Sequence, residues 1–132
     1  MKTTLLSIST PTGKRFQENI VQINADNAEG RIGVLAKHTP LVSSLKTSLF
    51  SIVYENGDIK HGAISGGVFN VTGLEITILT TDFVFESEID PKRAKEEILK
   101  IEKELSKDIK DAQKTALEER LKYEKLKLEL IS

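Results

Sequence analysis

Cysteine and tryptophan are absent from the 132 residues, and histidine occurs only at His38 and His61. Without cysteine, the chain can form neither a disulfide framework nor a thiolate metal site. The two histidines, with no acidic cluster between them, match no ligand spacing of a zinc site. Because His61 alternates in phase with Ile59 and Ala63, we expect it to be a partly buried, hydrogen-bonded strand residue. The sequence therefore predicts no metal site.

An excess of charge of one sign is also missing, and so is a long apolar run. The 19 basic and 20 acidic residues leave a net charge of −1, whereas nucleic-acid binders and polybasic membrane anchors show a basic excess. No run approaches the roughly 18 apolar residues of a spanning helix. Residues 1–8 alternate instead of forming the apolar stretch of a signal peptide. We therefore expect a soluble cytoplasmic protein that binds no nucleic acid and does not insert directly into a membrane.

Glycine is missing from the last part of the chain. All eight glycines lie at or before Gly73, whereas more than half of the charged residues lie from Asp90 onward. Such a change of composition marks a boundary between two architectures. We expect an all-β N-terminal sandwich or barrel over residues 1–86, followed by a C-terminal antiparallel α-helical hairpin over residues 90–132. The fold class is therefore α+β with segregated domains.

Short alternating runs indicate the β part. Residues 50–54 and 74–78 alternate apolar and polar side chains with period two. Turn residues separate such runs at intervals of roughly 8–12 residues, which is the spacing of a sandwich or barrel. Asn56 and Gly57 predict a type I′ hairpin turn, in which both central residues have positive φ.

A helical pattern begins at Asp90, which can cap free N–H groups, and Pro91, which suits the first helical position. The apolar residues that follow are spaced to line one face: Ala94, Ile98, Ile101 and Leu105. Residues 106–108 predict an interruption, and a second helix begins at about Ile109. Two helices with narrow apolar stripes cannot enclose a core of their own. They must pack on the sandwich, on a partner, or on each at different times.

No constellation in the sequence points to catalysis. Ser65, between Ile64 and Gly66, misses the G-x-S-x-G nucleophile elbow by one residue and lies between strand-like segments. A strand bend permitted by paired glycines is the expected role. Gly30 and Gly33 are followed by neither the G-K-[ST] ending of a phosphate loop nor a helix. We therefore expect no catalytic residues and no enzyme.

Three segments together resemble the epsilon subunit of bacterial F-type ATP synthases, the equivalent of the mitochondrial delta subunit. Residues 29–41, EGRIGVLAKHTPL, are similar to the family's loop E-G-x-x-G-[IV]-[LY]-P-x-H-x-P-L. Residues 63–71, AISGGVFNV, are similar to its strand pair A-x-S-G-G-x-x-x-V. Residues 89–94, IDPKRA, fit its nucleotide-associated motif [IL]-D-x-x-R-A. The resemblance covers essentially the whole chain in the family's order.

The resemblance implies a non-catalytic rotor subunit of the central stalk, peripheral at the cytoplasmic face of the cell membrane. It couples the catalytic head of a proton-transporting synthase to the ring of c subunits. The sandwich would bind the gamma subunit, and Arg31, Lys37 and His38 would contact gamma or the c ring, although a merely hydrogen-bonded loop is the alternative. Arg31 and Ala36 depart from the family, which often has an acidic residue and a proline there. If Arg31 faces the ring, its partner should be acidic or a carbonyl.

The resemblance also implies a regulatory role for the hairpin. In this family it lies folded on the sandwich or extends along gamma into the alpha/beta catalytic hexamer, where it blocks ATP hydrolysis. In some members ATP favours the folded form. By analogy the residues at the nucleotide would be Ile89, Asp90, Arg93, Ala94 and Lys100. Lys100 stands where ATP-binding members carry arginine, and lysine offers a point charge instead of a fork; Val84 replaces an acidic residue. We therefore expect no required cofactor and at most weak regulatory ATP.

Two alternatives stay open at this point. Asp90 is also a good helix cap, and Arg93 could pair with Glu97 one turn later, so neither residue by itself specifies a nucleotide site. A freestanding adaptor module whose helices recruit another protein is the rival from a different class. Co-purification with gamma and the c ring separates that rival from a synthase subunit.

Overall fold

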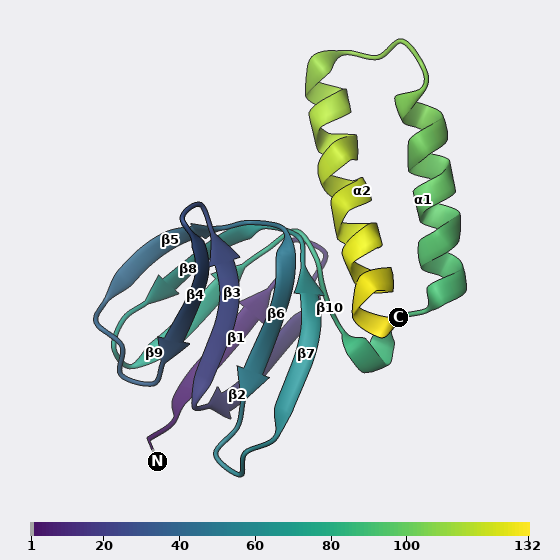
Figure 1. The fold of residues 1–132 in the computed structure, drawn as a ribbon. Helices are drawn as coiled ribbons and strands as arrows, with labels where there is room; N and C mark the ends of the chain where they lie inside the picture. Colours follow the sequence, from purple (N-terminus) through teal and green to yellow (C-terminus); the bar gives the residue numbers. More distant parts are fainter. Residues whose placement is uncertain (1) are drawn as a thin grey trace.

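The computed structural model describes residues 2–132 and places ten strands ahead of two α-helices (Figure 1). The elements in chain order are β1 (Thr4–Ser9), β2 (Arg15–Ile20), β3 (Gln22–Asn27), β4 (Gly30–Leu35), β5 (Leu41–Leu45), β6 (Ser48–Val53), β7 (Ile59–Ile64), β8 (Gly67–Val71), β9 (Glu75–Leu79), β10 (Phe83–Phe85), the short 3-10 helix η1 (Glu86–Glu88), α1 (Pro91–Leu105) and α2 (Asp111–Ile131). The predicted fold class, a sandwich followed by a helical hairpin, is confirmed.

Two five-stranded sheets form the sandwich. The first sheet has the order β2-β1-β9-β8-β5, and the second has the order β10-β7-β6-β3-β4. Side chains alternate between the core and the outer faces, so that Leu6 and Ile8 of β1 are fully buried whereas Leu5 and Ser7 are not. The core lies between the sheets and contains Phe50, Phe69 and Phe83 together with aliphatic residues from both.

The strand directions define two ends of the sandwich. The turns at residues 28–29, 46–47 and 65–66 lie together at one end, which we call the turn end. A hydrogen bond of 2.9 Å from the Lys46 N–H to the Asp26 carbonyl joins two of these turns. The start of β1 and the turns at residues 54–58 and 73–74 lie at the opposite end. The tip of the helical hairpin projects beyond the turn end (Figure 1).

The turn between β6 and β7 differs from its prediction. Gly57 has φ 91°, but Asn56 is not among the residues with positive φ, so the type I′ turn is wrong. The Gly57 N–H donates to the Tyr54 carbonyl and the Tyr54 N–H donates to the Asp58 carbonyl, each at 2.9 Å. This is a longer loop with glycine at the left-handed position. The Asn56 side chain accepts from the Asp58 N–H at 2.9 Å, an Asx turn that leaves Asn56 itself at negative φ.

The chain bends after Ser65, as expected, and the two glycines that follow lead it from one sheet to the other. Gly66, between β7 of the second sheet and β8 of the first, has φ 59°, and Gly67, the first residue of β8, has φ 140°. A Cβ at Gly67 would collide with the Leu79 carbonyl oxygen. The Ser65 N–H donates to the Asp82 carbonyl at 2.9 Å, which ties the bend to the segment before β10.

The first helix of the hairpin begins where it was predicted, and the second begins slightly later than predicted. Asp90 caps α1, and its side chain accepts from the backbone N–H groups of Lys92 and Arg93. The second helix starts at Asp111, two residues after the expected position. Helix α1 packs along α2, and it is α2 that contacts the sandwich, at β6, β7 and η1 (Figure 1). Over residues 2–132, neither helix combines the length and the apolar character needed to cross a membrane.

Candidate functional site at the junction of sandwich and hairpin

Tyr123 anchors the hairpin on the sandwich. Its side chain is 4% exposed and packs with Ala63 and Val84, and Leu49 and Ile89 border the same cluster. The Tyr123 hydroxyl donates a 3.0 Å hydrogen bond to a carboxylate oxygen of Asp82. Burial and the negative charge of Asp82 raise the pKa of Tyr123 far above its ordinary value. The phenol therefore stays protonated and serves as the donor of this bond at neutral pH.

A second polar contact lies one helical turn away. The hydroxyl of Thr47, in the β5–β6 turn, donates to a carboxylate oxygen of Glu119 at 2.9 Å. Thr47 is buried, whereas Glu119 is otherwise exposed. Tyr123 is the one fully buried side chain of α2. The contact between hairpin and sandwich is therefore small and partly polar.

A cavity of about 420 Å³ lies beside this contact. It is lined by Asp82, Val84, Glu88, Ile89, Asp90, Arg93, Ala94, Glu97, Glu124 and Lys127, and so by the end of the sandwich and both helices. The structure thus brings together four of the five residues expected at a nucleotide. Lys100, the fifth, is not part of the lining.

The cavity lining carries five carboxylates and only two cations, Arg93 and Lys127. Lys127 is already paired with Glu124 at 3.1 Å, with both side chains largely buried. Glu97 pairs with Arg120 at 3.3 Å, so the alternative in which Arg93 pairs with Glu97 is not the one that the structure forms. The cavity has the size for a nucleotide, but its charge opposes a polyphosphate.

The segment expected to be an interface loop is mostly a strand. Residues 30–35 form β4, the edge strand of the second sheet, because its alternating side chains pair with β3 in a regular ladder. The loop of the predicted motif is confined to residues 36–40, where Lys37 has φ 65° and the His38 ring nitrogen Nδ1 lies 2.7 Å from the Thr39 carbonyl oxygen.

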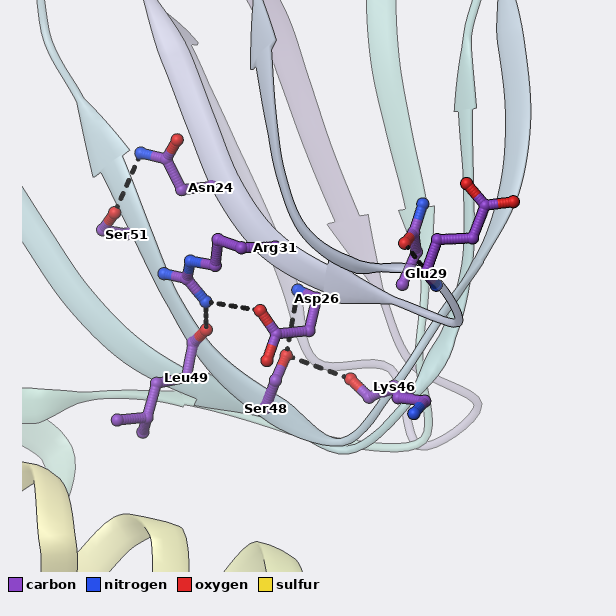
Figure 2. A network of polar contacts seen from close by, with 9 residues as sticks. Asn24, Asp26, Glu29, Arg31, Lys46, Ser48, Leu49 and Ser51 are labelled. Carbon is purple, nitrogen blue, oxygen red and sulfur yellow. Dashed lines mark hydrogen bonds and ion pairs between the residues drawn. The ribbon is translucent and has the colours of Figure 1, made fainter.

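Arg31 turns back onto its own chain. One guanidinium nitrogen donates to a carboxylate oxygen of Asp26 at 3.1 Å and to the Leu49 carbonyl at 2.6 Å (Figure 2). Arg31 lies at the turn end, whereas Lys37 and His38 follow β4 at the opposite end, at least about 13 Å away along the strand. The structure therefore does not bring these three predicted interface residues together.

His61 is exposed, so the expectation of a partly buried residue is wrong. Its side chain lies on the outer face of the second sheet, where the cluster around Tyr123 includes Ala63 but not His61. Within residues 2–132 no group of three or more potential ligands is arranged to hold a metal ion.

The outer face of the first sheet is a second notable surface. Its exposed apolar side chains are Val42, Val68 and Leu79, with exposures of 69%, 45% and 59%. Val68 and Leu79 lie directly opposite each other on β8 and β9. Their near neighbours on the same face are uncharged (Ser7, Ser9, Ser44, Asn70 and Thr77), whereas Arg15 of β2 and Glu75 of β9 lie at its margins. In a chain with 30% charged residues, exposed apolar side chains with uncharged neighbours mark an interaction surface.

The sequence interpretation missed the residues that dock the hairpin: Thr47, Asp82, Glu119 and Tyr123. One indication was available, since Tyr123 is the only aromatic residue from Asp90 onward. A lone aromatic side chain on a charged helix is a natural anchor. Nothing in the sequence indicated Asp82 as its acceptor.

Comparisons with known proteins agree with the fold. The family model of the ATP synthase delta/epsilon chain beta-sandwich domain matches residues 3–86. The sodium-ion-specific ATP synthase epsilon chain of Acetobacterium woodii is 35% identical over 91 residues, 69% of this chain and 68% of that protein. The ATP synthase epsilon chain of Mycoplasma mobile is 36% identical over 124 residues, 92% of this chain and 86% of that protein. A chain in the Euglena gracilis mitochondrial ATP synthase structure shares the fold at 23% identity, with a TM-score of 0.76 over 98% of this chain and 82% of that chain.

The architecture is a β-sandwich that carries a lightly attached helical hairpin. The chain belongs to the ATP synthase delta/epsilon chain family, as the match over residues 3–86 and the identity to epsilon chains show. The resemblance to bacterial epsilon subunits is thereby confirmed.

Proposed function

We propose that this chain is a rotor subunit in the central stalk of a proton-translocating F-type ATP synthase, at the cytoplasmic face of the cell membrane. Its sandwich, residues 1–86, couples the catalytic head to the c ring. Its hairpin, residues 90–132, inhibits ATP hydrolysis when it leaves the sandwich and extends along gamma into the alpha/beta hexamer. The observation that carries the regulatory part is the small contact that holds the hairpin on the sandwich.

The magnitude of that contact suits a reversible attachment. Burial of one tyrosine ring is worth about 2–3 kcal/mol, and the hydrogen bonds of Tyr123 and Thr47 add about 1 kcal/mol each. A swing of the population from 1:99 to 99:1 needs about 5.5 kcal/mol of differential binding. A partner surface of ordinary size can therefore displace the hairpin.

The outer face of the first sheet is the best surface for gamma. It presents Val42, Val68 and Leu79 among uncharged neighbours, and the hairpin leaves it free because α2 packs on the second sheet. We therefore assign this face to gamma, and Arg31, Lys37 and His38 to contacts with gamma or the c ring.

Removal of the hairpin tests the inhibitory role. We expect the assembled enzyme to hydrolyse ATP at least about twofold faster when its chain is truncated after Glu88. A gain of about twofold is expected if half of the full-length complexes are inhibited by an extended hairpin. The measurement compares ATPase rates of truncated and full-length complexes at low and high ATP. Unchanged rates at both concentrations would remove the inhibitory role and leave the coupling role standing. Failure of the chain to co-purify with gamma and the c ring would instead support the adaptor alternative.

Weak ATP binding at the junction cavity is a separate proposal. Ile89, Ala94 and Val84 offer an apolar wall for a base, and Arg93 offers one cation, but the carboxylates around them oppose the phosphates. At an ATP concentration about 100 times the dissociation constant, such a site would stabilise the docked hairpin by about 2.7 kcal/mol. That free energy shifts the docking equilibrium but does not switch it completely.

Calorimetric titration of the full chain with Mg-ATP tests this site. We expect a dissociation constant in the millimolar range, about −4 kcal/mol, and a further loss of binding in Arg93→Ala. Arg15→Ala is the matched control, because Arg15 is exposed on β2 and does not line the cavity. Submicromolar binding, or binding that Arg93→Ala leaves unchanged, would contradict the proposal.

A further inference from the structure

Strands β3 and β6 separate near the turn end, and there hydrogen bonds of side chains connect them in place of backbone–backbone hydrogen bonds. The pairing of β3 with β6 ends at Asn24 and Ser51. Beyond that point the Asp26 N–H donates to the Ser48 hydroxyl at 3.3 Å, and the Arg31 guanidinium donates to the Leu49 carbonyl at 2.6 Å (Figure 2). Arg31 thus reaches from the edge strand β4 across β3 to β6.

The ion pair of Arg31 with Asp26 adds little by itself. Both side chains are substantially exposed, at 50% and 39%, and such surface pairs contribute little to stability. The bond to the Leu49 carbonyl is the stronger contact, because it is short and has a charged donor. Asp26 holds the guanidinium in place for it. The main effect of Arg31 is therefore to hold the start of β6.

The same short segment, residues 46–49, also carries the hairpin. Thr47 donates to Glu119 of α2, and the Leu49 side chain borders the cluster around Tyr123. On its other side the segment contacts Asp26 through the Lys46 N–H and the Ser48 hydroxyl. One four-residue segment therefore touches the Arg31–Asp26 pair on one side and α2 on the other.

We propose that Arg31 is a positioning residue for hairpin docking, which couples the turn end of the sandwich to the attachment of α2. A partner group that binds Asp26 or Arg31 at the turn end withdraws the guanidinium from the Leu49 carbonyl and loosens residues 46–49. By linkage, a docked hairpin strengthens the Arg31 contacts to the same extent. This inference deepens the proposed function, because it concerns how hairpin release is controlled.

Hydrogen exchange of the isolated full chain tests the coupling. Undocked helices are marginal on their own, so the amides of α2 around residues 119–127 report release. We expect Arg31→Ala to speed their exchange about 3- to 10-fold, the range of energetic coupling through packed contacts. Arg31→Lys should speed it less, and Arg15→Ala, an exposed arginine of edge strand β2, should leave it unchanged. In a Thr47→Ala background the effect of Arg31→Ala should shrink.

Two outcomes would overturn the proposal. If Arg31→Ala speeds exchange only in β3, β4 and β6 while α2 keeps its rate, the contact is local and uncoupled. If Arg31→Ala acts equally with and without Thr47, no coupling runs through residues 46–49. Because no ATPase rate enters this measurement, its failure is distinct from failure of the inhibitory role.

Discussion

Val68→Glu should weaken binding of the gamma subunit by about 100-fold or more while the sandwich stays folded. Val68 lies on the outer face of the first sheet, directly opposite Leu79 and among uncharged neighbours. It is already 45% exposed, so a glutamate is tolerated in the free chain. In a complex the carboxylate would be buried without a partner, which costs about 3 kcal/mol or more and hence about two powers of ten in affinity.

Titration of isolated gamma with wild-type and variant chains measures this effect. Ile59→Glu is the matched control, because Ile59 is a similarly exposed aliphatic residue, at 54%, on a strand of the second sheet. Circular dichroism melts of both variants verify that the fold is intact. Equal losses for the two variants, or no loss for Val68→Glu, would show that gamma binds elsewhere.

Tyr123→Ala should release the hairpin without unfolding the sandwich. The substitution removes the one fully buried side chain of α2 and leaves a cavity against Ala63 and Val84, which costs about 3 kcal/mol or more. It also leaves Asp82 without its donor. Docking worth a few kcal/mol does not survive such a loss, so α1 and α2 should become largely unprotected against hydrogen exchange.

Tyr123→Phe separates packing from hydrogen bonding. It keeps the ring and removes only the bond to Asp82, so docking should weaken by about 1–2 kcal/mol and persist. Far-ultraviolet circular dichroism and hydrogen-exchange mass spectrometry of the wild type, Tyr123→Phe and Tyr123→Ala measure the graded loss of hairpin docking. Full protection of α2 in Tyr123→Ala would mean that the helices are stabilised by contacts other than this anchor.

The two-part architecture could be predicted because it rests on local chemistry. Alternation with period two and regularly spaced turn residues define strands, and the cap at Asp90 followed by Pro91 defines where the helices start. These features depend on residues close in the chain. The turn at Asn56 and Gly57 shows the limit, since the Asn56 side chain selected a different turn from the one its dipeptide favours.

The candidate site was only partly predictable. The motif at residues 89–94 identified one wall of the junction cavity, but its other wall comes from Asp82 and from Glu124 and Lys127 of α2, which lie 30 or more residues further along the chain. Whether a cavity is acidic or basic depends on which charged residues the helices turn toward it. That choice is made by packing and leaves no periodic pattern in the chain.

By itself the sequence determined the kinds of element, their order, the absence of catalytic motifs and the family resemblance, because each of these follows from neighbouring residues. Only the tertiary structure decided that β4 is an edge strand, that Arg31 bonds its own chain, and that Tyr123 meets Asp82. Those contacts join residues 18 to 41 positions apart, and their energies exist only once the sheets and the hairpin have packed.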